Sequence, residues 1–105
     1  MMPRWIFPIA TMLVLGASVS AQAETIQITM ENLEIAPVEA KARVGDTVEW
    51  INKDVFAHTA TARNGEWDVM LPPKKNGTLV LKKAGTVEYY CRFHPNMKAT
   101  LTVAP

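Results

Sequence analysis

The chain has 105 residues, with 11 Lys or Arg against 10 Asp or Glu, and its formal net charge is +1. This length holds one domain at most. The near-neutral charge argues against nucleic acid or an anionic membrane surface as a partner, because both are bound through a basic excess. With a single cysteine, the chain cannot form an internal disulfide.

Residues 1–23 predict a secretory signal peptide. They contain one charged residue, Arg4, then an apolar run, then small residues that end in AQA, which is the layout of a signal peptide with an A-x-A cleavage site. A retained membrane anchor is the alternative, but proline, glycine and serine interrupt the run and no positive cluster follows it. We expect cleavage after Ala23 and export to the periplasm of a domain of residues 24–105, without stable membrane association.

The first half of that domain predicts short β-strands, because apolar and polar residues alternate and turn residues recur. Residues 25–30 (TIQITM) form the first expected strand. Residues 34–44 are extended but interrupted by Pro37, which favours an edge strand or a bend. A Gly-Asp turn then leads into residues 47–52 (TVEWIN), and residues 54–63 are rich in β-branched side chains.

The second half continues the pattern. Residues 64–77 begin and end with Asn-Gly and are expected to be loop, with at most one short strand. Residues 78–91 form two strands divided at an Ala-Gly step, and residues 97–105 form the last strand. With no helical stripe anywhere, the sequence predicts an all-β domain, a sandwich or barrel of about seven or eight strands.

The segment CRFHPNM places Cys91, His94 and Met97 at steps of three residues. The period of two points Cys91 inward at the end of a strand. Pro95 fixes one backbone angle of the following loop, which brings the other two side chains back towards the same point. The second histidine, His58, lies on a separate strand and can reach this site only through the folded sandwich.

These residue types favour copper. Two imidazoles and a thiolate with a weak axial thioether are the ligand set of blue-copper electron-transfer sites. If His58, Cys91, His94 and Met97 all bind one Cu(I)/Cu(II) ion, no position stays open for a substrate or water. The sequence therefore predicts an electron carrier without catalytic residues, and not an enzyme.

Three segments resemble the cupredoxin (blue-copper) family, and within it the small bacterial amicyanin and pseudoazurin group. They are VGDTVEWIN (residues 44–52), His58 shortly after it, and AGTVEYYCRFHPNM (residues 84–97). The resemblance implies a Greek-key β-sandwich, one mononuclear copper ion, and a periplasmic monomer. It also implies single-electron shuttling between redox proteins such as a c-type cytochrome, a dehydrogenase or a reductase.

One departure from the family lies beside the first histidine. The family usually has Asn at the next position, where its side chain ties the two ligand loops together, and this chain has Thr59. A hydroxyl also donates and accepts hydrogen bonds but reaches less far. We therefore expect an altered reduction potential, in a direction that the sequence does not give.

Several alternatives stay open at this point. Cys91 is also compatible with an inert buried thiol, and Met70 competes with Met97 as the axial ligand. The same ligands would serve a periplasmic copper carrier or buffer. A structural zinc site formed by His58, Cys91 and His94 is a further alternative, although it leaves Met97 without a role.

Overall fold

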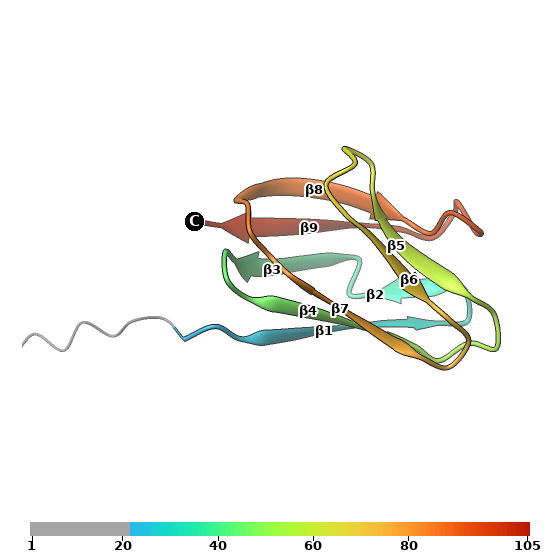
Figure 1. Cartoon of the computed structure of the whole chain (residues 1–105). Helices are drawn as coiled ribbons and strands as arrows, with labels where there is room; N and C mark the ends of the chain where they lie inside the picture. The colour runs from blue at the N-terminus through green and yellow to red at the C-terminus, as the bar shows by residue number, and fades with distance from the viewer. Residues whose placement is uncertain (1–21) are drawn as a thin grey trace, which may run out of the picture.

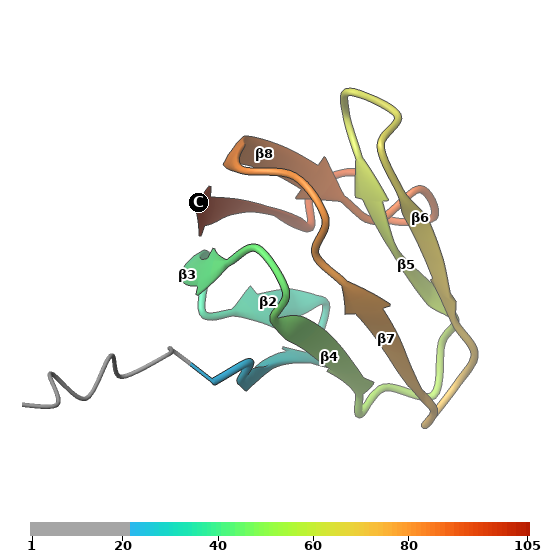
Figure 2. The same ribbon diagram turned by 60° about the vertical axis from the view of Figure 1, so that its left-hand side comes forward.

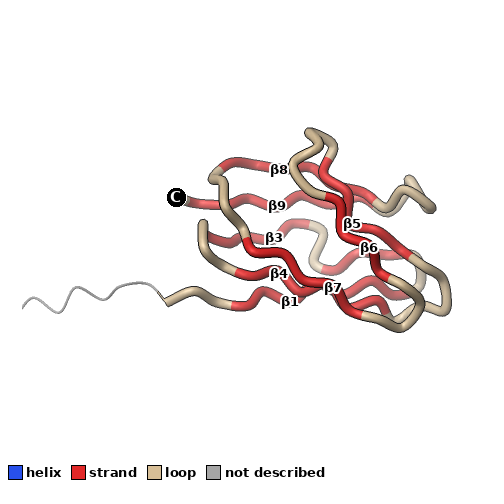
Figure 3. Tube along the Cα trace, in the orientation of Figure 1, coloured by secondary structure: helices blue, strands red, loops and turns tan. Residues whose placement is uncertain are grey.

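The computed structural model describes residues 22–105, so the predicted signal peptide lies almost wholly outside the described residues. The described part consists of strands and loops without a helix (Figure 3), and therefore has no helix able to cross a membrane. Its nine strands are β1 Thr25–Glu31, β2 Glu34–Ala36, β3 Glu39–Arg43, β4 Thr47–Asn52, β5 His58–Ala62, β6 Asp68–Leu71, β7 Asn76–Val80, β8 Gly85–Tyr90 and β9 Lys98–Ala104.

The strands form two sheets that pack face to face (Figures 1 and 2). One sheet has the order β2-β1-β4-β7 and the other has the order β3-β9-β8-β5-β6. The β1–β4 and β3–β9 pairs are parallel, and the remaining neighbours are antiparallel. The prediction of an all-β Greek-key sandwich is confirmed.

The structure has nine strands where the sequence predicts about seven or eight. Residues 34–44 form two strands, β2 and β3, which lie in different sheets on either side of Pro37. Proline lacks the N–H that a continuous ladder requires, so the chain leaves one sheet there and enters the other. The expected loop at residues 64–77 contains β6, a half-exposed edge strand whose weak alternation makes it hard to detect.

The core follows the predicted alternation. Val48 and Trp50 of β4 are fully buried, and the outward positions of that strand are partly exposed. The indole Nε1–H of Trp50 donates to the hydroxyl of Tyr89 on the opposite sheet at 3.3 Å, and Trp67 packs against both rings. Burial raises the pKa of Tyr89 to about 12, although the Trp50 hydrogen bond opposes this effect. Aromatic burial of this kind joins the two sheets.

Candidate metal centre

Three predicted ligands lie together at one end of the sandwich. His58 begins β5, Cys91 follows β8, and His94 lies in the loop between β8 and β9. The Cys91 Sγ atom is 3.6 Å from Nδ1 of His58 and 3.8 Å from Nδ1 of His94. The donor atoms of all three residues lie within 4.8 Å of one another. The sequence prediction that these side chains converge is confirmed.

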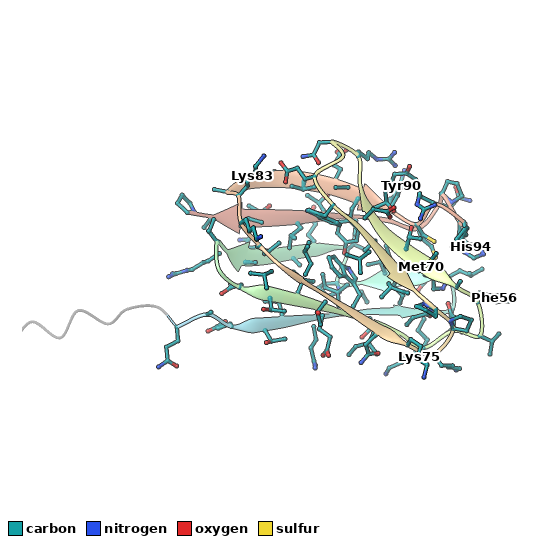
Figure 4. The ribbon with its side chains drawn as sticks, viewed as in Figure 1. Phe56, Met70, Lys75, Lys83, Tyr90 and His94 are labelled. Carbon is teal, nitrogen blue, oxygen red and sulfur yellow. The ribbon has the colours of Figure 1, made fainter. Side chains whose placement is uncertain are left out.

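Backbone hydrogen bonds fold the β8–β9 loop tightly. The N–H of Met97 donates to the carbonyl of His94 at 2.8 Å, and the N–H of Cys91 donates to the carbonyl of Met97 at 2.9 Å. These bonds return Met97 to the side of Cys91, and its side chain is only 2% exposed. The competing residue, Met70, lies on edge strand β6 and is 51% exposed (Figure 4). Ligation by Met97 stays a prediction.

The two histidines differ in their access to solvent. His58 and Cys91 are fully buried, whereas His94 is partly exposed. The Phe56 ring, which is 53% exposed, lies 6.0 Å from the His94 ring between centroids. Both side chains lie at the end of the sandwich opposite Lys83 (Figure 4). The centre therefore has one solvent-facing candidate ligand with an apolar neighbour.

A carboxylate fixes the orientation of the buried histidine. Nε2 of His58 lies 2.7 Å from Oδ2 of Asp54. An ionised carboxylate only accepts hydrogen bonds, so Nε2 carries a proton and Nδ1 is the ring nitrogen that faces Cys91. Burial acts to raise the pKa of Asp54, but hydrogen bonds from His58 and from the amides of Leu33 and Asn32 outweigh it and lower the pKa.

A buried amide in turn holds the loop that carries Asp54. The side chain of Asn52 donates to the carbonyl oxygens of Phe56 at 2.8 Å and of Leu71 at 3.2 Å. Its own Oδ1 accepts the N–H of Asp54 at 2.9 Å. The sequence predicts no role for Asn52 or Asp54. Asn52 only ends the VGDTVEWIN segment, and Asp54 is a carboxylate four residues before His58. That spacing predicts contact on a helix but not in a loop.

Thr59 makes the connection that the family normally makes through Asn. Its backbone N–H donates to Sγ of Cys91 at 3.4 Å, and its Oγ1 accepts the N–H of Arg92 at 2.9 Å. Thr59 is fully buried. The shorter side chain therefore still joins the segment that follows His58 to the segment that follows Cys91.

The arrangement fits a transition metal. Imidazole nitrogen and thiolate sulfur are the donors that suit copper and zinc. Because Nε2 of His58 bonds to Asp54, Nδ1 is the nitrogen that faces the site, and the Thr59 amide supplies a hydrogen bond to the sulfur. Within residues 22–105, His58, Cys91 and His94 form the one group of three or more such side chains able to hold a metal ion.

Known proteins resemble this chain in sequence over most of its length. The cupredoxin-like domain family matches residues 4–103. The methylamine utilization protein MauL of Methylorubrum extorquens is 30% identical over 88 residues, which cover 80% of this chain and 77% of MauL. Amicyanin of Paracoccus denitrificans is 30% identical over 84 residues, which cover 74% of this chain and 64% of that protein.

Solved structures of amicyanin superimpose on most of the chain. The crystal structure of amicyanin from Paracoccus versutus has a TM-score of 0.65 at 26% identity, covering 84% of this chain and 87% of that one. The Cu(I) form of an amicyanin mutant has a TM-score of 0.66 at 29% identity, covering 84% and 88%. The sandwich, the converging candidate ligand residues and the family match over most of its length show that this chain belongs to the cupredoxin-like domain family.

Proposed function

We propose that this chain is a periplasmic electron-transfer protein that binds one copper ion through His58, Cys91, His94 and Met97. The observation that carries the proposal is the convergence of Cys91 Sγ with Nδ1 of both histidines at 3.6 and 3.8 Å. Amicyanin, a structural relative, is known in a Cu(I) form. A copper ion bound here would supply a single electron, exchanged between Cu(I) and Cu(II).

The protein's own contribution is to keep its ligand residues nearly fixed in both oxidation states. His58 is oriented by Asp54, and Cys91 is held by its backbone bond to Met97 and by the amide of Thr59. Buried, hydrogen-bonded side chains rearrange little when an electron arrives. With four protein ligands the site offers no substrate position, which supports a carrier and not an enzyme.

Electrons enter or leave through the exposed edge of His94. Its neighbours Phe56 and Phe93 are 53% and 47% exposed, and apolar side chains at a solvent-facing ligand suit brief docking with a redox protein. The partner belongs to the classes expected from the sequence, such as a c-type cytochrome, a dehydrogenase or a reductase. MauL is named for methylamine utilization, and this link concerns MauL alone.

Export of the chain is part of the proposal. In the structure the N–H of Glu24 donates to the Asp46 carboxylate at 2.9 Å. Cleavage after Ala23 would turn that nitrogen into the terminal ammonium, whose charge complements the carboxylate. An intact mass of the periplasmic protein that begins at Glu24 supports the boundary, and a mass that includes residues 1–23 contradicts it.

A redox titration of the purified copper protein distinguishes electron transfer from copper delivery. An electron carrier gives a reversible one-electron curve and keeps its copper through repeated cycles. A copper carrier or buffer releases the metal to a chelator in one oxidation state, so its curve is not recovered on reoxidation. Retention of copper with no reversible electron exchange would contradict both functions and favour a structural site.

A further inference from the structure

β5, which begins with His58, and β8, which ends just before Cys91, stop pairing before they reach these two residues. The β5–β8 ladder consists of the pairs Ala62–Tyr89 and Thr61–Tyr90 and ends there. Regular backbone hydrogen bonds therefore do not fix the ligand ends of β5 and β8 against each other. Side chains close this gap.

Four residues form a closed hydrogen-bonded ring across the gap, and we refer to them as the Asp68 ring: Thr59, Thr61, Asp68 and Arg92. The N–H of Arg92 bonds to Thr59 Oγ1 at 2.9 Å, and the hydroxyls of Thr59 and Thr61 are 2.8 Å apart. The Thr61 hydroxyl bonds to Oδ1 of Asp68 at 2.7 Å. The Arg92 side chain then returns to the same carboxylate, with Nη2 at 3.3 Å from Oδ2 and Nε at 3.4 Å from Oδ1.

The direction of each bond in the ring is determined by its two ends. A backbone N–H can only donate and an ionised carboxylate can only accept. Thr61 therefore gives its proton to Asp68, and its oxygen accepts the proton of Thr59. That leaves the lone pairs of Thr59 for the Arg92 N–H, so both hydroxyls donate once and accept once. Consecutive bonds aligned in this way strengthen one another.

Asp68 is the common acceptor of both arms of the ring. The hydrogen bond from Thr61 lowers the pKa of Asp68, burial opposes this, and the Arg92 side chain lowers it further. The carboxylate is thus ionised near neutral pH and polarises the chain of hydroxyls towards itself. Because Arg92 is bound by both its backbone and its side chain, the peptide that follows Cys91 is anchored to β6.

We propose that Asp68 is a positioning residue for the metal centre, which holds the Cys91–Arg92 peptide against β5 through Thr61 and Thr59. Asp68 does not touch the ligands itself. Through Thr61 and Thr59 it holds the Arg92 amide against β5. Because Cys91 is then kept close to β5, the hydrogen bond from the Thr59 N–H to the Cys91 sulfur at 3.4 Å is maintained. Hydrogen bonds around a coordinated cysteine tune the reduction potential of copper. The effect on copper rests on the proposed function, whereas the bracing of the loop does not.

Two variants break the ring at different places. Thr61→Val removes one hydroxyl at nearly constant volume and charge, and leaves the Thr59 proton without its acceptor. Asp68→Asn keeps an acceptor for Thr61 but removes the negative charge. Glu88→Gln is the matched control, because Glu88 forms a surface pair with Arg63 at 3.9 Å on the same sheet and is outside the ring.

The test combines amide hydrogen exchange of the metal-free protein with the reduction potential of the copper protein. Exchange of the Arg92 N–H is expected to be several-fold faster in Thr61→Val and Asp68→Asn than in Glu88→Gln or the wild type. Both ring variants should also shift the potential relative to the control. Asp68→Asn should shift it upward, because loss of a nearby negative charge favours Cu(I).

Two results would overturn the proposal. If both ring variants match Glu88→Gln in Arg92 amide exchange rate and in reduction potential, the ring does not position the centre. Faster exchange with an unchanged potential would show that Asp68 is only a structural brace. If the wild type binds no copper, the proposed function fails, and the metal-free exchange data alone decide whether Asp68 positions the loop.

Discussion

Nε2 of His58 and Oδ2 of Asp54 lie 2.7 Å apart, and Asp54 is only 9% exposed. Asp54 also accepts the amides of Asn32 at 2.7 Å and Leu33 at 3.0 Å. The carboxylate is therefore held from three sides while it holds the imidazole. This relationship sets which nitrogen of His58 faces Cys91.

Replacement of Asp54 should weaken metal binding. Asp54→Ala removes the acceptor that fixes the His58 tautomer, and loss of such a partner typically costs 10–100-fold in metal affinity. Competition with a Cu(I) chelator measures this directly. Asp46→Ala is the control, because Asp46 also accepts two backbone amides, those of Glu24 and Arg43, but lies at the other end of β4. Equal affinities for the two variants would contradict the assigned role of Asp54.

Replacement of Met97 should change the electronic properties of the site without unfolding the protein. Met97→Leu conserves volume in a buried position, and such exchanges usually cost less than about 1.5 kcal/mol. Since the axial ligand tunes the potential of a blue-copper site, the potential should shift while the copper stays bound. Met70→Leu, on the exposed edge strand, should leave the potential unchanged. A shift in the Met70 variant alone would reverse the assignment.

Burial of Tyr89 makes the free energy of unfolding depend on pH in the alkaline range. Its pKa is raised from 10.0 in the unfolded chain to about 12 in the folded protein. The unfolded state therefore loses its proton first, and the stability contributed by this group is present below pH 10 and lost as pH rises towards 12. Urea unfolding of the metal-free protein at pH 9 to 11 tests this. In Tyr89→Phe the free energy of unfolding should fall less steeply with pH over the same range. Identical slopes for the wild type and the variant would contradict the prediction.

Gly77 allows β7 to pass close to β6, the edge strand of the other sheet. A Cβ atom at Gly77 would lie 2.7 Å from Cδ2 of Leu71 and 2.8 Å from Cγ1 of Val69. Gly77→Ala should therefore lower the free energy of unfolding by about 1–3 kcal/mol, as overpacking typically does. Thr78→Ala, at the exposed neighbouring position, should change it by less than about 0.5 kcal/mol. Urea denaturation compares the two, and equal values would show that the strands can move apart freely.

The fold and half of the site follow from local sequence patterns. The alternation that places Val48 and Trp50 inward is a property of the strand itself, so it predicts their burial. Cys91 and His94 are close because one short loop carries both. His58 is different, since its convergence with them depends on the packing of the two sheets, and only the family motif identifies it.

The residues that support the site could not be predicted in this way. Asp54 reaches His58 through an irregular loop whose path is set by Asn52. Asp68 meets Arg92 only because β6 joins the edge of the sheet, and β6 has too weak an alternation to be placed from sequence. Loop geometry and edge pairing are tertiary properties, so neither carboxylate has a period or spacing that indicates its role.

The visible spectrum of the exported protein with Cu(II), recorded beside Cys91→Ser, tests copper ligation most directly. A copper–thiolate bond in a His₂Cys site with a weak axial ligand should give an intense charge-transfer band at about 600 nm. We predict this band in the wild type and its loss in Cys91→Ser. Circular dichroism should show that both proteins are folded. A colourless wild-type protein, or a band that persists in Cys91→Ser, would contradict the assignment of Cys91 as a copper ligand.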